Sequence, residues 1–378
     1  MCGIVGIVNY KKNILEEKNI IENMTKTITK RGPDEEGIFT SKHANFGHRR
    51  LSIIDIENGK QPMSFKIDDV TYTIVYNGQI YNAEELRETL RDNGFKFKTH
   101  SDTEVLLKAY VFYGKNVCKH INGIFAFAIW NDKKEELFVA RDHFGIKPLY
   151  YSFSDENFIF ASEVKAILEH PSVNAVLDRT GIAELFGIGP SHTPGICPFK
   201  GIEELEPANY IVYNKDCFKK EEYWKLETKP HTDDLETTSE KLRFLIKDSI
   251  ERQLVSDVPI GTLLSGGLDS SIITKYASDF YKEKYGKKLD TFSVDYVDQE
   301  KNFVKNDFQP NTDNYYIDLM VKFLDTNHKK IILDTPELFD TLEDAVIARD
   351  FPGMADVDSS YLLFFKNVIK DIKVDLSG

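Results

Sequence analysis

The apolar runs of this chain change in character across one short polar stretch. Residues 225–234 read KLETKPHTDD, a polar sequence with Pro230 that has the composition of a linker. Before it, short apolar runs bounded by Gly, Asn, Asp or Lys clusters are typical of strands. After it, short apolar runs alternate with amphipathic stretches of helical length. Since 378 residues also exceed the ~100–200 residues of an ordinary domain, we expect two domains.

The first half predicts a layered α+β domain, because runs of strands are interrupted by only a few helices. Strands are expected in CGIVGIV, NFGHRRLSIID, VTYTIVYNG, IFAFAIWN, ELFVARD, PLYYS and FIFASE, and near 209–213. Apolar residues at helical spacing predict helices over 82–93 and 103–113.

The second half alternates strands with helices, which is typical of a parallel, doubly wound sheet. Strands are expected over 258–264, 291–296, 330–334 and 373–376, and helices over 235–254, from SGGLDSS to about 285, and over 314–325, 336–348 and 358–371. Ligands of such sheets bind at the carboxyl ends of the strands, and the sequence stops one loop after its last expected strand. We therefore expect a fragment that ends within a binding loop.

Composition argues against several classes of protein. The net charge of −13 argues against a general nucleic-acid binder, which needs a surplus of Lys and Arg. No apolar stretch reaches the ~18–20 residues of a membrane span, so no membrane partner is expected. The 4 cysteines are too few and too scattered for a disulfide scaffold or a zinc site. The start, MCGIVGIVNYKK, lacks the features of a signal peptide, so we expect the cytoplasm.

Cys2 directly follows the initiator Met. Removal of Met1 leaves Cys2 a free α-amino group, whose pKa of ~7.7–8.0 allows it to accept a proton near neutral pH. A thiol that carries its own general base is a complete nucleophilic unit. The alternative is a small apolar residue that opens a strand.

Other polar residues of the first half suit the chemistry of an amide substrate. Arg50 stands in HRRLSIID, and its fork-shaped guanidinium can clamp a carboxylate. The amide of Asn77 beside the backbone N–H of Gly78 gives two donors for an oxyanion. Asp102 opens an expected helix, where capping is its alternative role.

MCGIVGIV, RGPDEEG, HRRLSIID, NGQIYN, SDTEV, GIFAFAIW and ARDHFGIKPLYY occur in order and together resemble a class II glutamine amidotransferase domain of the N-terminal-nucleophile type. The resemblance implies an αββα sandwich over residues 2–215, in which Cys2 attacks the glutamine side-chain amide. It implies that Asn77 and Gly78 form the oxyanion hole and that Asp102 binds the substrate ammonium. The implied carboxylate clamp and adjacent wall are Arg50, Leu51, Ser52, Ile53 and Ile54. The family usually has Glu where this sequence has Gln79, so we expect weaker glutamine recognition but not a lost activity.

The sequence SGGLDSS lies between an expected strand and an expected helix. Its glycines allow the backbone to approach a phosphate, and the helix N-terminus adds partial positive charge. It is not a Walker A loop, because no Lys follows the glycines. The alternative is a Gly-rich turn with a Ser cap. Asp269 suits Mg²⁺, which takes oxygen ligands together with phosphates.

The loop resembles the PP-loop of ATP pyrophosphatases, which implies an α/β domain with a parallel sheet over 235–378, incomplete at its C-terminus. The implied ATP-binding residues are Leu264, Ser265, Gly266, Gly267, Asp269, Ser270, Val294, Ser377 and Gly378. Asp269 is also the implied Mg²⁺ ligand. His328 fits the family pattern, with a surface His before a strand as its alternative.

The two halves together resemble the glutamine-hydrolysing asparagine synthetases. The resemblance implies ATP-dependent amidation of L-aspartate to L-asparagine through β-aspartyl-AMP, with ammonia from glutamine. It places residues 351–356 near aspartate and AMP, and it implies no prosthetic group. Two alternatives stay open: a related amide-forming synthetase with another acceptor, and a truncated chain with glutaminase activity only. A homodimer is the assembly that we expect.

Overall fold

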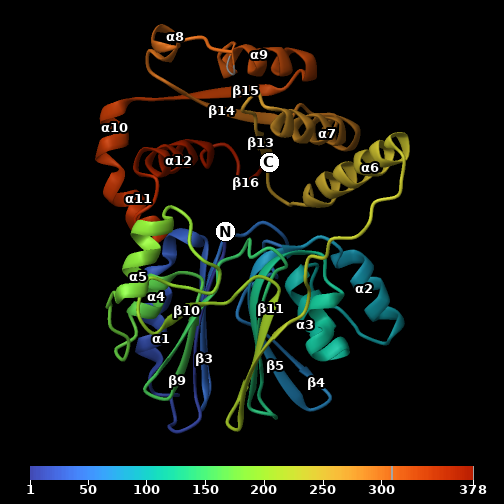
Figure 1. Cartoon of the computed structure of the whole chain (residues 1–378). Helices are drawn as coiled ribbons and strands as arrows, with labels where there is room; N and C mark the ends of the chain where they lie inside the picture. The colour runs from blue at the N-terminus through green and yellow to red at the C-terminus, as the bar shows by residue number, and fades with distance from the viewer. Residues whose placement is uncertain (308–309, 378) are drawn as a thin grey trace. The chain divides into compact units, whose positions relative to one another are not determined.

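The computed structural model describes residues 1–307 and 310–377, so Gly378, one of the expected nucleotide-binding residues, lies outside the described residues. The chain forms two compact units. The first contains residues 1–228 together with 349–352, and the second contains 229–348 together with 353–378. Figure 1 colours the chain from its N-terminus in blue to its C-terminus in red.

Two six-stranded antiparallel sheets form the centre of the first unit. One sheet has the order β10 (Ile202–Glu204), β8 (Tyr150–Ser154), β9 (Asn157–Ala161), β1 (Gly3–Asn9), β3 (Ala44–Arg50), β2 (Glu35–Thr40). The other has the order β12 (Cys217–Glu222), β11 (Asn209–Asn214), β7 (Glu136–Arg141), β6 (Gly123–Asn131), β5 (Val70–Ile80), β4 (Met63–Ile67).

Helices cover the outer face of each sheet, as Figure 1 shows. Helices α1 (Lys18–Thr27) and α4 (Val164–Leu168) pack on the β1 sheet, while α2 (Ala83–Asp92) and α3 (Asp102–Tyr113) pack on the β5 sheet. Shorter helices are α5 (Arg179–Ala183) and the turns Thr29–Arg31, Gly114–Lys119 and Glu184–Ile188. The predicted αββα sandwich is therefore confirmed.

The central strand β1 is buried on both faces, and its side chains alternate between two cores. Ile4 and Val8 belong to the core between the sheets, whereas Val5 and Ile7 belong to the core under α1 and α4. The period of two is that of a strand, so a residue's parity tells which layer its side chain enters. By this parity Cys2, which directly precedes β1, lies on the side between the sheets.

The second unit contains a parallel four-stranded sheet, as the sequence predicted. Its order is β15 (Asn327–Leu333), β14 (Asp290–Tyr296), β13 (Ile260–Leu263), β16 (Val374–Leu376). The helices are α6 (Leu235–Gln253), α7 (Leu268–Tyr285), α8 (Gln299–Asn302), α9 (Asp313–Leu324), α10 (Thr335–Asp340), α11 (Leu342–Arg349) and α12 (Ala355–Val368). None of the helices among the described residues is long and apolar enough to span a membrane.

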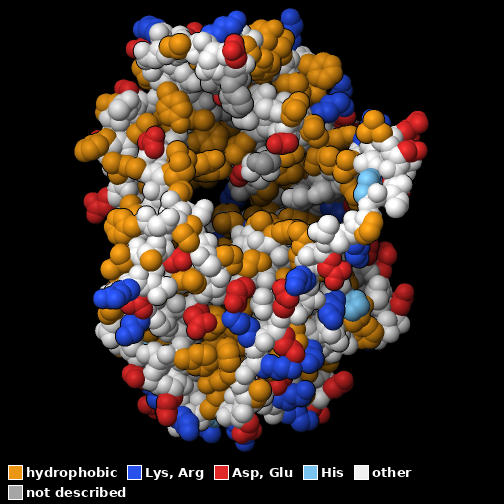
Figure 2. Space-filling view, viewed as in Figure 1, with side chains coloured by type: hydrophobic (Ala, Val, Ile, Leu, Met, Phe, Trp, Pro, Cys, Tyr) orange, Lys and Arg blue, Asp and Glu red, His pale blue; other side chains and the backbone are white. Residues whose placement is uncertain are grey.

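Several local features differ from the sequence prediction. Strands β2, β4, β10 and β12 were not expected, and the strand expected in NFGHRRLSIID ends at Arg50. The expected helix 336–348 is divided into α10 and α11 at Thr341, whose hydroxyl bonds back to the Glu337 carbonyl oxygen. Helix α1 was not predicted, because it begins at Glu17 without a side-chain cap and is rich in β-branched residues. Figure 2 shows acidic and basic side chains interspersed over the sandwich.

Candidate functional site

Strand pairing brings Cys2 next to the Arg50 end of β3. Gly3 pairs with Arg49 and Ile4 pairs with His48, so the antiparallel register continues to Cys2 opposite Arg50. The Cys2 sulfur lies 3.7 Å from the Leu51 carbonyl oxygen, and the Cys2 carbonyl accepts a hydrogen bond from Arg31 Nε at 2.8 Å. Cys2 is therefore held by partners from the turn Thr29–Arg31 and from the segment that follows β3.

Burial is the largest cause of the pKa shifts at the N-terminus. Burial raises the pKa of the Cys2 thiol, while the Leu51 carbonyl contact and the charge of Arg50 act in the opposite direction. Asp102 adds to the increase, so Cys2 lies within electrostatic reach of both Arg50 and Asp102. Burial also lowers the pKa of the amino terminus, here on Met1, to about 6.

Asn77 and Gly78 lie on β5, and Asn77 points between the sheets. Its parity matches that of Val75, which belongs to the core between the sheets. Asn77 is buried, and its Nδ2 has no hydrogen-bond partner among the described residues. Such a donor is costly to bury, so it is a feature to be explained by a ligand. Gly78 cannot carry a side chain, because a Cβ would lie 2.2 Å from the Ile124 carbonyl oxygen.

Arg50 is buried, and its guanidinium donates hydrogen bonds to other groups of the first unit. One terminal nitrogen donates to Glu35 Oε2 at 2.8 Å and to the Ile56 carbonyl at 2.9 Å. The other donates to the carbonyls of Ile54 and Asp55. A glutamine carboxylate would therefore have to exchange with one of these partners.

The expected wall residues form the loop that Arg50 holds. Leu51, Ser52, Ile53 and Ile54 follow β3 without regular structure, and the Ser52 N–H donates to Asp34 Oδ2 at 2.8 Å. Gln79 lies on β5 opposite Ile124. The structure thus brings the expected wall and the expected oxyanion donors to the same end of the sandwich as Cys2.

Asp102 is buried at the first turn of α3, but it is not the capping residue. Ser101 caps the helix by accepting from the Thr103 N–H. Asp102 Oδ2 instead accepts from Tyr76 Oη at 2.9 Å and from the Ile80 N–H at 3.1 Å. Burial raises the pKa of Asp102, and these hydrogen bonds oppose the increase.

Sequence reasoning did not identify Tyr76 or the contacts of Arg31. Tyr76 adjoins Asn77 and bonds to Asp102, but nothing in an apolar run such as TIVYNG reveals a partner on another element. Arg31 did have a signal, since it stands in the charged turn RGPD; it bonds to Cys2 and forms an ion pair with Glu163 at 2.9 Å.

The SGGLDSS loop of the second unit lies at the point where the strand order reverses. The chain runs from β13 to β14 and β15 on one side, and β16 then pairs with β13 on the other side. Crevices at such points, beyond the carboxyl ends of the strands, are the usual ligand sites of doubly wound sheets. Thr262 pairs with Leu376, so Ser377 follows on beside the start of the loop.

The loop is shaped by internal hydrogen bonds. Ser270 Oγ lies 3.1 Å from Ser265 Oγ and 3.3 Å from the Ser265 nitrogen, and it donates to the Gly267 carbonyl. Gly266 has φ +83°, and a Cβ there would lie 2.9 Å from the Asp313 carbonyl oxygen. The Ser270 hydroxyl therefore organises the loop, and Gly266 is a position that only glycine fits.

Leu264, Val294 and Asp269 lie around the same strand ends, whereas His328 does not. The Leu264 N–H donates to the Phe292 carbonyl at 2.8 Å, and Val294 lies two residues further along β14. Asp269 is exposed in the first turn of α7. His328 is the second residue of β15, at the amino end of the parallel sheet, so the structure does not bring it to this loop; its ring nitrogens lie 3.0 Å from Thr291 Oγ1 and from Ser293 Oγ. The described residues contain no group of three or more His, Cys, Asp or Glu side chains placed to hold a metal ion.

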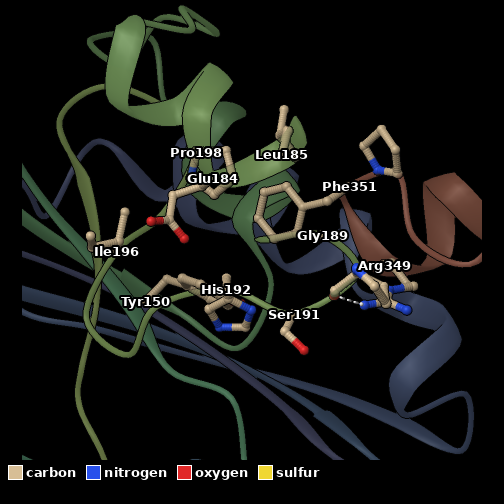
Figure 3. A pocket seen from close by; sticks show the side chains of 12 residues that line it. Tyr150, Glu184, Leu185, Gly189, Ser191, His192, Ile196, Pro198, Arg349 and Phe351 are labelled. Atoms are coloured by element: carbon tan, nitrogen blue, oxygen red, sulfur yellow. Dashed lines mark hydrogen bonds between the residues drawn. The ribbon is translucent and has the colours of Figure 1, made fainter. Parts of the chain in front are cut away.

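The segment 349–352 belongs to the first unit, although the chain on both sides belongs to the second. Asp350 accepts from the Val164 N–H at 2.7 Å and forms an ion pair with Lys165, so it caps α4. Phe351 packs on Tyr150 and Phe199. Figure 3 shows the pocket that this segment lines, where an Arg349 guanidinium nitrogen donates to the Pro190 carbonyl at 3.1 Å.

Comparisons with known proteins match two families to successive parts of the chain. The family described as glutamine amidotransferase domain matches residues 1–224, and the family described as asparagine synthase matches residues 241–378. The chain is 47% identical to asparagine synthetase [glutamine-hydrolyzing] 3 of Bacillus subtilis (strain 168), over 100% of this chain and 62% of that protein. It is 29% identical to asparagine synthetase B [glutamine-hydrolyzing] of Escherichia coli (strain K12), over 100% of this chain and 63% of that protein.

A solved structure titled as the allosteric regulatory enzyme of purine biosynthesis has a TM-score of 0.47 and 16% identity, over 88% of this chain and 80% of that chain. The chain thus spans less than two thirds of the length of these synthetase relatives. This chain therefore belongs to the glutamine amidotransferase domain family, and an asparagine synthase domain follows in its second half.

Proposed function

We propose that the protein hydrolyses glutamine in its first unit and uses the ammonia for ATP-dependent conversion of L-aspartate to L-asparagine in its second. The observation that carries the first half is the buried Asn77 Nδ2, a hydrogen-bond donor without a partner among the described residues, at the end of the sandwich that holds Cys2. A tetrahedral intermediate at Cys2 would supply the missing acceptor.

Glutamine hydrolysis requires Cys2 as the first residue. Removal of Met1 gives Cys2 its own amine, which takes the thiol proton while the sulfur attacks the side-chain amide carbon. The oxyanion that forms accepts from Asn77 Nδ2 and the Gly78 N–H, ammonia leaves, and water then releases glutamate. Asp102 binds the substrate ammonium, and Arg50 binds its carboxylate by exchanging a loop carbonyl. Leu51, Ser52, Ile53, Ile54 and Gln79 line the substrate.

Asparagine formation uses the crevice at the ends of β13 and β16. The N–H groups of the SGGLDSS loop and of the α7 N-terminus bind the phosphates of ATP. Leu264 and Val294 contact the nucleoside, and Ser265, Gly266, Gly267, Ser270 and Ser377 surround the phosphates. The aspartate β-carboxylate attacks the α-phosphorus and releases pyrophosphate, so that ammonia can displace AMP from β-aspartyl-AMP.

Mg²⁺ fits this site only as an ion shared with the nucleotide. Asp269 offers one exposed carboxylate beside the phosphate-binding loop, and the described residues provide no three-ligand cluster. Mg²⁺ commonly keeps several waters and takes one or two carboxylates together with substrate phosphates. When bound, it would neutralise the charge of the pyrophosphate leaving group.

Two assays test the proposal. Glutamate release from glutamine should be lost in Cys2→Ala, and unchanged release in that variant would refute the nucleophile. Calorimetry should show ATP binding that depends on Mg²⁺, and aspartate should be required for pyrophosphate release. No ATP binding would leave a glutaminase alone, and pyrophosphate release without aspartate would indicate another acceptor.

The N-terminus needs its own measurement. Intact-mass analysis should find Met1 absent, because a retained Met blocks the amine of Cys2. A free Cys2 thiol suits the reducing cytoplasm, where we place the protein.

A further inference from the structure

Tyr76 is the residue of β5 that precedes Asn77, and side chains hold its backbone where the neighbouring strand has ended. Strand β4 pairs with β5 only as far as Met63 opposite Ile74. Beyond that point Gln61 replaces a strand partner. Its Oε1 accepts from the Tyr76 N–H at 2.6 Å, and its Nε2 donates to the Tyr76 carbonyl at 3.1 Å. A side-chain amide can make both bonds because it carries the same donor and acceptor as a peptide group.

The Tyr76 carbonyl has a second partner from the opposite sheet. His48 Nε2 lies 3.0 Å from this oxygen, and since a carbonyl only accepts, the ring donates through Nε2. The carbonyl belongs to the same peptide group as the Asn77 nitrogen. Gln61 and His48 therefore hold that peptide in addition to its pairing with β6, where Asn77 lies opposite Ala126, and the peptide carries the Asn77 side chain.

Gln61 also connects both sides of the glutamine site. Its Nε2 donates to Thr103 Oγ1 at 3.3 Å, beside Asp102, and the Tyr76 hydroxyl donates to Asp102. We propose that Gln61 is a positioning residue for the oxyanion donor Asn77, an inference that rests on the proposed glutaminase function. Gln61 does not act on glutamine itself. It aims the Asn77 amide at the point where negative charge develops.

Kinetics of glutamate release test this role with Gln61→Met, which keeps the length of the side chain but removes its polar atoms. A small misplacement of a catalytic donor costs up to about 100-fold, so we expect kcat to fall about 10- to 100-fold. KM should change less than about threefold, because only the transition state uses the oxyanion donor. A fall below twofold in kcat would overturn the inference.

The control is Thr73→Val on the same strand. Thr73 Oγ1 lies 2.8 Å from Ser64 Oγ, so this variant also removes a side-chain hydrogen bond between β4 and β5. It should leave kcat within about twofold of the native value, because it does not touch the Tyr76 peptide. An equal loss in both variants would mean that hairpin stability alone is responsible, and would overturn the inference.

A double variant shows whether Gln61 acts through Asn77. When Asn77 is already Ala, Gln61→Met should lower kcat less than about threefold. Multiplicative losses would overturn the inference. Gln61→Glu is the second variant if Gln61→Met does not fold; it keeps the acceptor for the Tyr76 N–H, loses the donor to the carbonyl, and should lose kcat similarly.

Amide hydrogen exchange separates this inference from the proposed function. Exchange of the Tyr76 N–H should become faster in Gln61→Met and stay unchanged in Thr73→Val, and an unchanged rate in Gln61→Met would overturn the positioning role. A native protein that releases no glutamate would instead overturn the proposed function, whatever the exchange shows.

Discussion

At the residue scale, Asn77 and Asn45 are two buried asparagines with opposite surroundings. Asn45 Nδ2 donates to the Ile14 carbonyl at 2.7 Å, whereas Asn77 Nδ2 has no partner among the described residues. Asn77→Ala should therefore lower kcat for glutamate release about 100- to 1,000-fold, the usual cost of an oxyanion donor. Asn45→Ala should instead lower the free energy of unfolding by about 1–3 kcal/mol and leave kcat intact.

Urea unfolding followed by fluorescence measures this contrast, because the 2 tryptophans, Trp130 and Trp224, both lie in the first unit. If Asn77→Ala destabilised the first unit more than Asn45→Ala and spared kcat, Asn77 would be a structural residue.

His48 makes the stability of the first unit depend on pH. Burial lowers its pKa to about 4, below the ordinary value of 6.5. Below pH 6.5 His48 becomes protonated in the unfolded chain but stays neutral in the folded protein. The free energy of unfolding therefore decreases as the pH falls towards 4. The loss is on the order of 3 kcal/mol for a shift of this size. His48→Gln keeps a donor for the Tyr76 carbonyl but does not titrate. Between pH 7 and pH 4 its free energy of unfolding should therefore decrease by about 3 kcal/mol less than that of the native protein.

Tryptophan-detected urea unfolding between pH 7 and pH 4 is the measurement. The matched control is His231→Gln, at an exposed position. Parallel pH profiles for the native protein and His48→Gln would contradict the role given to burial.

At the element scale, the two glycines of the turn between β13 and α7 differ in backbone conformation and in the space around them. Gly266 has φ +83° and faces the Asp313 carbonyl, whereas a Cβ at Gly267 would meet only Ser265 Oγ at 3.6 Å. Gly266→Ala should destabilise the second unit by about 1–2 kcal/mol. Gly267→Ala should leave the stability of the second unit unchanged. Both variants should weaken ATP binding, because a methyl group at either position would obstruct the approach of a phosphate to the SGGLDSS loop.

Scanning calorimetry with and without ATP separates these effects. The transition of the first unit is identified by its tryptophan fluorescence. Equal thermal midpoints for Gly266→Ala and the native second unit would show that the positive φ carries no strain.

Elements with strong local patterns could be predicted from the sequence, and elements that depend on distant partners could not. Apolar runs such as β1 and β6 are buried on both faces, so their composition alone indicates strands. Short edge strands such as β4 and β12 lack that signal, since much of their surface is exposed.

The same reasoning applies to the candidate site. Motifs pointed to Cys2, Arg50, Asn77 and Asp102, which the structure gathers at one end of the sandwich, though their roles stay predictions. Gln61 could not be found, because its partners are backbone atoms of Tyr76 on β5 and the side chain of Thr103 on α3. A pattern along the chain does not show which side chain replaces a missing strand.

At the scale of the whole molecule, each unit should keep its activity when the other is disabled. Asp269 lies in the second unit, and Cys2 lies in the first. Asp269→Ala should abolish aspartate-dependent pyrophosphate release and leave glutamate release unchanged, while Cys2→Ala should leave ATP binding unchanged. Enzyme assays and calorimetry check both variants. A joint loss of both activities at constant fold stability would contradict a two-site protein.

The anchoring of residues 349–352 in the first unit has a consequence for how this protein is made on the ribosome. Asp350 caps α4 and Phe351 fills the core beneath it, yet both follow nearly all of the second unit in the sequence. Translation delivers the polypeptide from its N-terminus, so the first unit can complete its packing against Phe351 only after that residue emerges from the exit tunnel. A chain that ends at the linker would lack Asp350 and Phe351, so its first unit would have neither the cap of α4 nor this packing contact.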